Sequence, residues 1–532
     1  MPGDRESERP WLSALERLAP LIALTAVVAA SARIVSTYQV LSHTTDEPGH
    51  LACGLHYLEG SVCPYEYAPL ARAAIAVGPY LAGARSLGMA DVPREGLAIL
   101  AVHSTRFLAL ARGGVLPFFW LACGALYWWG RRYFGKAAAA MSVLFFSLLP
   151  PVLAHAGLAT ADMAETGCLT AAFLAWLMWA EQPTWRRSVI CGVLTGLAVL
   201  AKFSTCGFLP VILGTSLAWY VLVEKPPPGS LPAAFRERLT PLCVIALAAL
   251  MTWWAGYQFS MGRMHGVPIP APQFIAALRY IVDFNAGGQP AYLLGEISDT
   301  GWWYYYPVAL AFKTPIPFLL LVGCGLLACA RGWRRTEFVS PLIFVAGILL
   351  VGCVSQINIG VRHVLPVYCG LALLAGNGVI LLAGGKKHPA WGISAAAALL
   401  GWLIWTGAAQ HPDYLAYFNE MAGQEPEKVL VDSDLDWGQD FKRLARRLQD
   451  LGATEVHFST MVPVNLEGFP PLLSPIDPVM PAPGWTAVSP TWWKLRQFEF
   501  GLSPLRQDGP FWMDHTKPTE RVGSILLFHF PN

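Results

Sequence analysis

Long apolar runs recur along the chain and are separated by short polar segments. A bilayer core needs about 20 predominantly apolar residues per helix. Runs of suitable length lie at 18–40, 106–129, 137–155, 161–180, 188–203, 206–223, 240–258, 306–330, 337–355, 362–384 and 390–409. The pattern therefore predicts a polytopic α-helical membrane protein with about eleven transmembrane helices, of which the two within 188–223 are the hardest to divide.

The first apolar run follows Arg5, Arg9 and Arg17, which is the charge order of a secretory signal peptide. However, the run is longer than the apolar part of a signal peptide, and no clear small-residue cleavage site follows it. We therefore expect it to be retained as a signal anchor with a cytoplasmic N-terminus.

Positive charges gather in alternate loops between the predicted helices. If the N-terminus is cytoplasmic, every short loop on the inner side is basic, as the positive-inside rule requires. These loops contain Arg131, Arg132 and Lys136; Arg186 and Arg187; Lys225, Arg236 and Arg238; Arg331, Arg334 and Arg335; and Lys386 and Lys387. With an odd number of helices, the segments predicted to lie on the outer side are 41–105, 156–161, 259–305, 356–361 and everything after 410.

The first outer loop, 41–105, contains the apolar stretches 75–87 and 96–102. These stretches are too short to cross a bilayer and are typical of amphipathic helices that lie at its surface. Cys53 and Cys63 share this loop, where oxidising conditions would allow them to pair. Two free thiols are the alternative.

The chain changes character after Gln410, with fewer long apolar runs and many prolines between Pro463 and Pro490. The patterns predict strands and an amphipathic helix there: strands at 455–461, 524–530 and 429–431, and the helix at 440–451. We therefore divide the chain into a transmembrane core, 1–409, and a small extracytoplasmic α/β domain, 410–532.

The composition agrees with a membrane location, because 55% of the 532 residues are hydrophobic and only 14% are charged. A soluble protein of this composition would expose far too much apolar surface. The net charge of +2 gives no basic field that would attract nucleic acid. The chain also lacks the phosphate-loop, zincin, serine-hydrolase and CxxC motifs, so the sequence does not support the protein classes that these motifs define.

Two adjacent carboxylates, Asp46 and Glu47, follow the first apolar run, with His50 and Arg72 further along the same loop. Charged side chains at the point where a helix leaves the bilayer are functional candidates. A carboxylate in a confined site can take the proton of an attacking hydroxyl, and a neighbouring carboxylate can raise its proton affinity or hold a metal ion. The alternative is a solvated loop in which Asp46 caps a helix.

Further charged residues fall on the same side of the membrane. Asp162 follows a short turn, and its alternative role is that of a first-turn acid stabilised by the helix dipole. Phosphate groups bind arginine in bidentate fashion and lysine as a point charge. The candidate cations are Lys202, Lys313, Arg362 and His363. For the two lysines, a long side chain that reaches the membrane interface is an equal alternative.

Two other motifs have structural interpretations. The aromatic run 302–306, at the mouth of an apolar run, is typical of an interfacial aromatic belt. Residues 432–438 resemble the start of a calcium loop, but the glycine is one place late and Arg443 stands where the bidentate acid should be. A helix N-cap by one of these aspartates is the better interpretation.

Together, these segments resemble the GT-C glycosyltransferases of the protein O-mannosyltransferase and aminoarabinose-transferase type, especially their bacterial family-39-like members. Residues 45–50 resemble the family's acidic motif, and 66–72 its His-Pro-Pro-Leu segment, with Tyr67-Ala68 in place of His-Pro. The resemblance continues through 158–162, 196–202, 303–317, 358–363, 411–419 and 436–440.

This resemblance implies a multi-helix membrane core, a sugar donor carried on polyprenyl phosphate, and an acid of the first outer loop acting as general base. By motif match, the base is Asp46, with Glu47 beside it as the second catalytic candidate. The expected location is the bacterial plasma (inner) membrane, with the active site on the periplasmic or extracellular face. The residues expected to bind substrate are His50, Arg72, Asp162, Lys202, Lys313, Arg362 and His363.

The sequence therefore predicts the transfer of a sugar from a polyprenyl-phosphate donor to a hydroxyl of a lipid, glycan or protein acceptor. A transporter of a lipid-linked or small anionic substrate is the main alternative, although the polar residues gather on one face rather than at the membrane midplane. A scaffold that presents the C-terminal domain is the other alternative. Binding of a divalent metal ion by the acids and His50 stays open, because no ligand spacing requires it.

Overall fold

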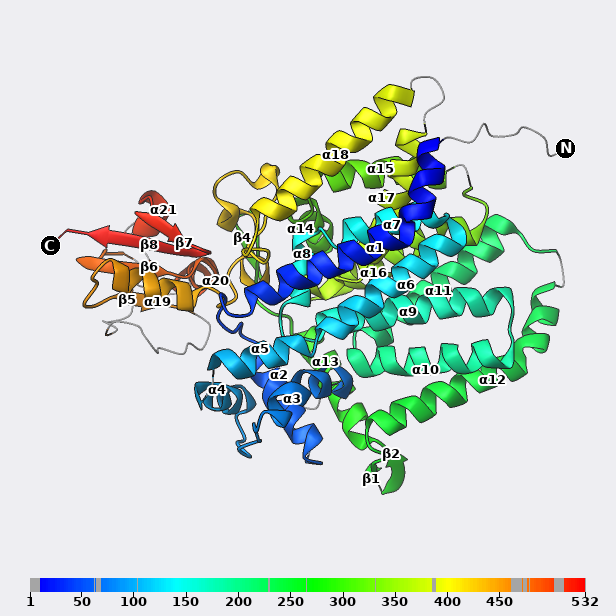
Figure 1. The fold of residues 1–532 in the computed structure, drawn as a ribbon. Helices are drawn as coiled ribbons and strands as arrows, with labels where there is room; N and C mark the ends of the chain where they lie inside the picture. Colours follow the sequence, from blue (N-terminus) through cyan, green and yellow to red (C-terminus); the bar gives the residue numbers. More distant parts are fainter. Residues whose placement is uncertain are drawn as a thin grey trace.

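The computed structural model describes residues 10–531 apart from 62, 64–67, 103, 228–229, 265, 331, 385–388, 461–470, 472–475, 478 and 502–510. Packed apolar helices form most of the molecule, and a small α/β unit made of C-terminal residues lies at one end of them (Figure 1).

Every predicted apolar run contains helix. The helices are α1 (Pro10–Thr37), α5 (Ser104–Gly113), α6 (Leu116–Tyr133), α7 (Lys136–Phe146), α8 (Pro150–Ala156), α9 (Asp162–Glu181), α10 (Trp185–Ala201), α11 (Thr205–Trp219), α12 (Ser230–Gly256), α14 (Tyr305–Lys313), α15 (Ile316–Cys329), α16 (Thr336–Val354), α17 (Val367–Ala383) and α18 (Pro389–Ala409).

Among the described residues, six helices are long and apolar enough to cross a membrane, or up to eight if each of two bent helix pairs is one span. Two other predicted spans correspond to the shorter apolar helices Phe338–Val354 and Val367–Ala383. The remaining one corresponds to α10, which has 17 residues. The structure thus supports a multi-pass helical membrane protein and does not confirm the count of eleven.

Two helix pairs are sharply bent where proline interrupts the backbone hydrogen bonds. Helices α7 and α8 meet at 69°, and α14 and α15 meet at 117°. Pro150 begins α8, and Pro315 precedes α15. Proline lacks an N–H and disfavours helical geometry at the preceding residue, so a helix stops there. The second bend directly follows Lys313, the last residue of α14.

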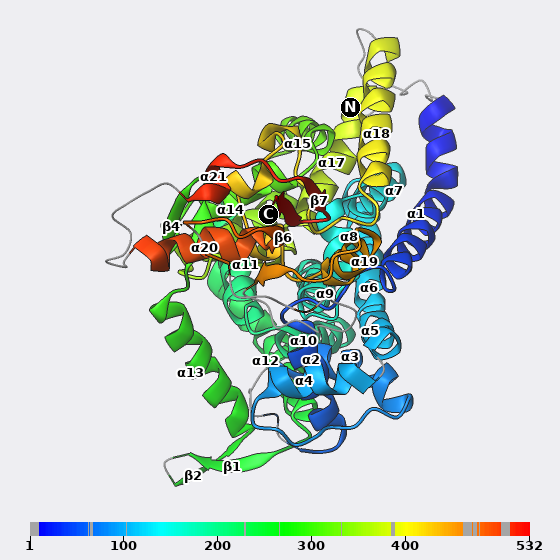
Figure 2. The ribbon, with the colours of Figure 1, turned by 90° about the vertical axis from the view of Figure 1, so that its left-hand side faces the viewer.

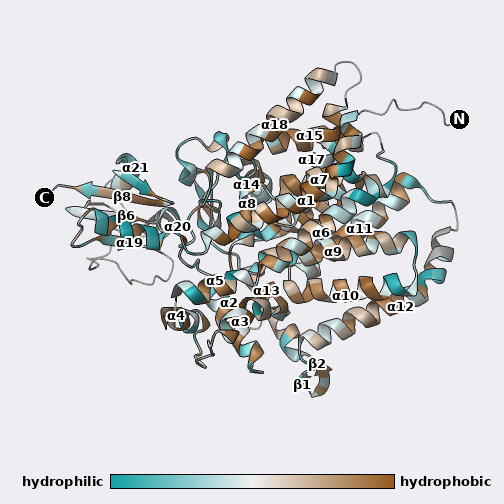
Figure 3. Ribbon diagram, viewed as in Figure 1, coloured by the Kyte–Doolittle hydropathy of each residue, from teal (hydrophilic) through white to brown (hydrophobic). Residues whose placement is uncertain are grey.

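The outer helices expose large apolar side chains. Leu24 of α1 and Leu247 of α12 are each 61% exposed, and Trp405 of α18 is 72% exposed. Figure 3 shows hydrophobic residues along most of the helical body, whereas the C-terminal unit is more hydrophilic. Large exposed apolar surfaces are unfavourable in water and mark contact with other apolar material. This surface agrees with an integral membrane protein.

The first outer loop folds into α2 (Glu47–Leu58), α3 (Pro69–Leu81) and α4 (Val92–Val102). Helices α3 and α4 confirm that the two short apolar stretches of this loop contain helix. Cys53 and Cys63 form a disulfide, as the first of the two alternatives predicted. The motif residues Glu66 and Tyr67 lie outside the described part of the chain.

The second large outer segment connects α12 to α14. It consists of two short hairpins on either side of a helix: β1 (Met261–Met264), β2 (Val267–Pro270), α13 (Pro272–Gly287), β3 (Ala291–Leu293) and β4 (Glu296–Ser298).

The C-terminal residues form a four-stranded sheet with strand order β5-β6-β8-β7. Strand β5 runs parallel to β6, and the other pairs are antiparallel. The elements are α19 (Phe441–Asp450), β5 (His457–Ser459), β6 (Gly484–Val488), α20 (Pro490–Gly501), α21 (Trp512–His515), β7 (Glu520–Val522) and β8 (Ile525–Phe530).

Alternate residues of β8 bury opposite faces of this sheet, as the two-residue period of a strand requires. Ile525 and Leu527 pack with Leu444 of α19. Leu526 and Phe528 pack with the cluster around α20 and α21, which includes Trp512. The sheet therefore has an apolar core on each side.

The elements β5, β8 and α19 confirm three of the predictions for this segment. The strand predicted at 429–431 is wrong, because these residues form a turn and irregular backbone with no strand pairing. The carbonyl of Val429 accepts a hydrogen bond from Leu294 N at 2.9 Å, and Val431 packs with Tyr292. Their apolar character reflects burial against the second outer segment, not a place in a sheet.

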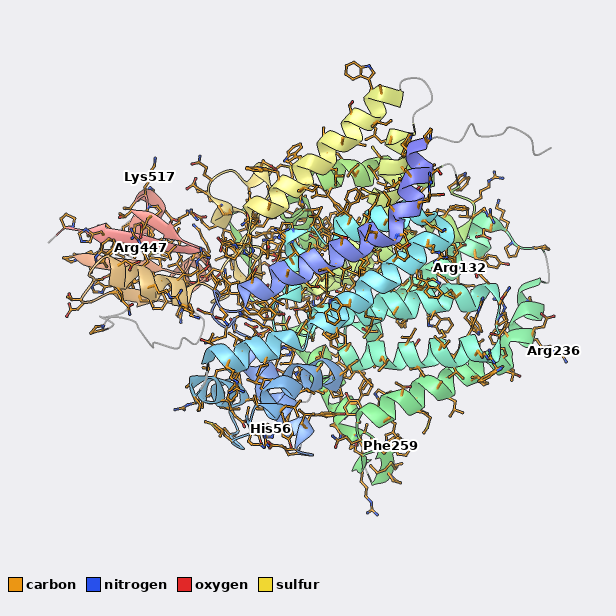
Figure 4. All side chains as sticks on the ribbon, in the orientation of Figure 1. His56, Arg132, Arg236, Phe259, Arg447 and Lys517 are labelled. Atoms are coloured by element: carbon orange, nitrogen blue, oxygen red, sulfur yellow. A yellow bond between two sulfur atoms is a disulfide. The ribbon has the colours of Figure 1, made fainter. Side chains whose placement is uncertain are left out.

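The two ends of the helical body carry different segments. Figure 4 shows Arg132 and Arg236, from loops predicted to be cytoplasmic, at the end away from the C-terminal unit, which carries Arg447 and Lys517. Viewed from the end with the C-terminal unit, α19 and β6 lie in front, above α2 to α4 (Figure 2). The first outer loop and the C-terminal unit, both assigned to the outer side, therefore lie towards the same end.

Candidate active site

Asp46 lies between α1 and α2, and its side chain is 33% exposed. It occupies the N-cap position of α2, but its carboxylate makes no capping hydrogen bond. Instead, its Oδ2 accepts a hydrogen bond from Nη1 of Arg362 at 2.7 Å, across 316 residues of sequence. The structure therefore replaces the capping alternative with an ion pair between two distant segments.

Arg362 is held by three further contacts. Its Nε donates to Ser433 Oγ at 3.1 Å and to the carbonyl of Ile359 at 3.3 Å. Its guanidinium carbon lies 4.1 Å from the centre of the Trp437 ring, a favourable cation–π distance. The side chain is 13% exposed. A cation from the turn before α17 and an acid from the first outer loop are thus joined on a platform from the C-terminal segment.

The aromatic run at the start of α14 supports the turn in front of this arginine. Tyr305 Oη accepts a hydrogen bond from Gly360 N at 3.1 Å, and Tyr306 Oη donates to Ile357 O at 2.7 Å. Both tyrosines are buried. The predicted aromatic belt therefore describes the exposed Trp303, whereas these two tyrosines fix the position of a loop.

Glu47 has surroundings unlike those of its neighbour. Its two oxygens each lie 2.8 Å from a nitrogen of Arg112 on α5, and both side chains are 0% exposed. The backbone N–H groups of Thr44 and Ala159 also donate to Glu47, each at 2.8 Å. Burial opposes the charged carboxylate, but Arg112 and these backbone donors outweigh it and hold the pKa of Glu47 below its ordinary value.

Arg112 also binds the backbone that precedes Asp46. It donates to the carbonyls of Leu41 at 3.2 Å and Ser42 at 2.6 Å. Through Glu47 it also fixes Ala159, in the turn that leads to α9. Arg112 and Glu47 therefore join the two loops that carry Asp46 and Asp162.

Asp162, the first residue of α9, belongs to a second ion pair. Its Oδ1 lies 2.8 Å from Lys202 Nζ, and its Oδ2 accepts from Thr160 Oγ1 at 2.8 Å. Lys202 also lies 3.4 Å from Glu165, one turn further along α9. Asp162 is thus more than a helix-dipole acid, and Lys202 is held between two carboxylates rather than extending freely to the interface.

Two of the predicted histidines lie beside these pairs. His50 is half-buried, and its buried Nδ1 has no hydrogen-bond partner within the described part of the chain. Burial and the positive charge of Arg72 lower the pKa of His50 to about 3, against the attraction of Asp46 and Asp162. His363 stacks on Tyr306, with 5.8 Å between the ring centres. Both side chains serve as neutral groups near the pairs.

Lys313 contacts the C-terminal segment rather than either ion pair. Its ammonium donates to the carbonyls of Leu415 at 2.8 Å and Asp434 at 2.5 Å, and it lies over the ring of Phe418. The side chain is only 1% exposed. These two hydrogen bonds and the cation–π contact dock the C-terminal segment on α14. Arg72 is also buried and donates to Ala68 O at 3.0 Å.

The sequence interpretation missed Arg112, Trp437, Ser433 and Asp432. Arg112 lies inside the predicted apolar run 106–129, in the last turn of α5, and has no motif around it. Asp432 has a left-handed backbone, with φ of 59°. Burial and the charges of Asp46 and Asp434 raise the pKa of Asp432 to about 6, against the effect of Arg362. The only available signal was the aspartate-rich run 432–436.

Metal binding by side chains alone finds no support in the residues that the structure describes, which contain no group of three histidine, cysteine, aspartate or glutamate residues arranged to hold an ion. Most of the predicted acids instead have protein cations as partners, as the two ion pairs and the Glu47–Arg112 contact illustrate.

Residues 116–255, from α6 into α12, match the model of a family described as dolichyl-phosphate-mannose-protein mannosyltransferase. This stretch contains Asp162 and Lys202. The match confirms, for this part of the chain, the resemblance seen in the sequence. No curated protein sequence matches the chain.

Three solved structures are similar at low identity. The first is ArnT from Cupriavidus metallidurans bound to undecaprenyl phosphate. It is 14% identical with a TM-score of 0.49, and the match covers 95% of this chain and 97% of that chain. The second is the oligosaccharyltransferase from Archaeoglobus fulgidus in the apo form. It is 14% identical with a TM-score of 0.47, and the match covers 84% of this chain and 58% of that chain. The third is AglB from the same organism, in complex with an inhibitory peptide and a dolichol-phosphate. It is 13% identical with a TM-score of 0.46, and the match covers 73% of this chain and 55% of that chain. This chain thus spans little more than half the length of the two oligosaccharyltransferase chains.

Proposed function

We propose that this chain, which resembles the dolichyl-phosphate-mannose-protein mannosyltransferases, is a membrane glycosyltransferase that uses a polyprenyl-phosphate-linked sugar. The observation that carries the proposal is the Asp46–Arg362 pair, a partly exposed carboxylate and an arginine held 2.7 Å apart by segments from three parts of the chain. An acid and a phosphate-binding cation side by side are the two groups that this transfer requires.

In the proposed reaction, a hydroxyl of a lipid, glycan or protein acceptor attacks the anomeric carbon of the donor. The hydroxyl proton passes to Asp46, and the acceptor oxygen forms the new bond to carbon. The bond between that carbon and the phosphate oxygen breaks, and its electron pair leaves with the polyprenyl phosphate. Asp46 has one oxygen, Oδ1, without a partner among the described residues, so this atom is free to meet the acceptor.

Arg362 is the proposed ligand of the donor phosphate. An arginine suits phosphate because two of its nitrogens can bind two phosphate oxygens at once. A phosphate bound there competes with Asp46 for the guanidinium. Donor binding would therefore free the Asp46 carboxylate to face the acceptor hydroxyl. Lys202, held between Asp162 and Glu165, adds positive charge further from Asp46.

The remaining predicted residues support this arrangement. Glu47 and Arg112 position the loop of Asp46 and so take a structural rather than a catalytic role. Lys313 docks the C-terminal segment. His50 and His363 add neutral polar groups next to the ion pairs.

The architecture that we propose is of the GT-C type, with a transmembrane core, 1–409, an extracytoplasmic α/β domain, 410–532, and the active site on the outer face of a bacterial plasma membrane. Support comes from the separation of Arg132 and Arg236 from the C-terminal unit (Figure 4). Impermeant thiol labelling of single cysteines at 227 and 532, in a variant without the nine native free cysteines, tests this. The reagent should reach only position 532 from outside the cell.

The activity is tested with purified protein in liposomes, supplied with a radiolabelled polyprenyl-phosphate sugar and membrane extract as the acceptor source. We expect labelled acceptor and an equal amount of free polyprenyl phosphate. Movement of intact donor across the bilayer without cleavage of the sugar–phosphate bond would identify a transporter instead. If the protein neither cleaves nor moves any of the donor sugars, the proposal is wrong.

A further inference from the structure

The C-terminal segment reaches the predicted donor site at 432–437, a run that the sequence interpretation treated as structural. Trp437 provides the ring under Arg362, and Ser433 accepts from its Nε. Asp434 Oδ1 accepts from Val361 N at 3.1 Å, next to the arginine. These contacts join a helix-end turn of the membrane core to a segment 71 residues later in the chain.

The close approach of the two segments depends on Gly360. Its φ is 90°, a conformation that favours glycine. A Cβ atom at this position would lie 2.7 Å from Ser433 Oγ, which is too close for any real contact. Ser433 Oγ also donates to the carbonyl of Ile359. The backbone of the turn therefore fits closely against Ser433.

The platform is itself fixed to the membrane core from two sides. Lys313 of α14 donates to the carbonyl of Asp434. Thr45 N, directly before Asp46, donates to the carbonyl of Trp437 at 3.1 Å. Trp437 is 3% exposed. The same short segment thus contacts Arg362 through side chains and Thr45, the residue before Asp46, through backbone.

These contacts restrict the guanidinium of Arg362. Nε and Nη1 are engaged, one face lies on the indole ring, and Nη2 has no hydrogen-bond partner within the described part of the chain. A free arginine side chain loses considerable rotamer entropy when it binds a ligand. Fixing it beforehand removes much of that cost, so the segment 432–437 prepares Arg362 for an anion.

We propose that Trp437 and Ser433 are positioning residues of the donor site, which hold Arg362 so that it can bind the phosphate of a polyprenyl-phosphate sugar. This inference rests on the proposed function. It makes the C-terminal segment part of the binding site of the enzyme and not an appended domain.

The test measures binding of undecaprenyl phosphate, without a sugar, to the full-length protein in detergent, together with KM and kcat for the labelled donor. Trp437→Leu removes the ring and should weaken undecaprenyl phosphate binding by about fivefold to tenfold, with a matching rise in KM. Trp437→Phe keeps an aromatic face and should recover most of the affinity. Ser433→Ala should weaken binding by about two- to threefold, because Nε keeps its bond to Ile359 O.

A double-mutant cycle separates positioning from a general loss of stability. In an Arg362→Ala background, Trp437→Leu should cause no further loss of affinity, because the side chain that it positions is gone. Trp512→Leu is the matched control: it removes a buried tryptophan of the C-terminal unit that packs on Phe528. This variant should lose thermal stability and keep the affinity of the wild type.

Two results would overturn the inference. One is wild-type affinity in Trp437→Leu, and the other is an equal loss from Trp437→Leu with and without Arg362. Failure of the proposed function is distinguishable, because the wild-type protein would then neither bind undecaprenyl phosphate nor cleave a labelled donor, whatever the variants do.

Discussion

Asp46 and Glu47 are adjacent acids, and each binds an arginine, yet the two ion pairs differ in every other respect. The Asp46–Arg362 pair has one contact, at 2.7 Å, and its acid is 33% exposed. The Glu47–Arg112 pair has two contacts, at 2.8 Å, between side chains that are 0% exposed. The comparison shows that neighbouring residues with the same chemistry can have very different surroundings, one partly open to solvent and one fully enclosed.

The physical reason lies in what surrounds each carboxylate. A buried charge is tolerated only when its partner and further hydrogen bonds satisfy it. Glu47 meets that condition with five donors: two nitrogens of Arg112, the N–H and hydroxyl of Thr44, and the N–H of Ala159. A group so satisfied has little capacity left for a substrate. Asp46 keeps one oxygen and part of its surface available, which is why we propose it, rather than Glu47, as the acid that meets the acceptor.

The largest expected effect comes from Asp46→Asn. The amide is nearly the same shape but cannot accept the acceptor's proton, so turnover should fall by about 10²–10⁴-fold. Thermal stability should change little, because partly exposed ion pairs contribute only about 0–1 kcal/mol. The measurement is initial rate with labelled donor. Asp91→Asn, at an exposed acid of the same loop, is the control and should keep its rate; a similar rate in both variants would remove Asp46 as the base.

Glu47→Gln should act on stability. It leaves the Arg112 charge buried without a counter-charge, which costs about 3–5 kcal/mol. The quantity measured is the free energy of unfolding in detergent. The folded fraction should keep its turnover within severalfold of the wild type. Glu181→Gln breaks an ion pair whose side chains are 36% and 31% exposed, and should cost less than about 1 kcal/mol. A greater loss of turnover in folded Glu47→Gln than in Asp46→Asn would reverse the two roles.

Arg362→Lys tests the cation of the Asp46–Arg362 pair. Lysine keeps the charge but loses the planar group that stacks on Trp437 and can bind phosphate with two nitrogens. Apparent affinity for the donor should weaken by about tenfold, while the melting temperature stays nearly constant. Arg447→Lys, at a partly exposed pair with Glu520 in the C-terminal unit, should change neither quantity. Lost stability with normal affinity would make Arg362 a structural residue.

The smallest expected effect is in the pH dependence of stability. Because the pKa of Glu47 is lower in the folded protein than its ordinary value of 4.5, the ionised carboxylate stabilises the fold at higher pH. This contribution should be lost as the pH falls below about 4.5. The Glu47→Gln variant has no carboxylate at this position, so acid should not cause this part of the loss of stability in it. Unfolding midpoints measured from pH 7 to pH 3 check this, and parallel curves for the two proteins would contradict it.

Sequence reasoning predicted the members of the two ion pairs better than their roles. Asp46, Arg362, Asp162 and Lys202 stood out because each is a charge beside an apolar run, and the structure pairs them. Lys313 stood out for the same reason, but its ammonium binds backbone carbonyls of the C-terminal segment. A charge near the membrane is visible in the sequence, whereas the atom it faces is not.

The C-terminal segment shows the same limit. Its helix and two of its strands follow from local periodicity, and the structure contains them. The apolar triplet 429–431 has the composition of a strand but is buried against the second outer segment. Residues 432–437 contact Arg362 from a position that Lys313 and Thr45 of the membrane core help to fix.

The sequence by itself determined that the chain is a multi-pass membrane protein, which segments lie together at one end, and which charges are candidates for the site. These properties depend on the local distribution of apolar and charged residues. The tertiary structure decided the partners: Glu47 meets Arg112 across 65 residues, and Asp46 meets Arg362 across 316. Such contacts arise from helix packing and from the bends at proline, so no pattern of neighbouring residues contains them. Since the surroundings of a carboxylate set its proton affinity and its freedom to bind, only the fold could assign the two acids their different roles.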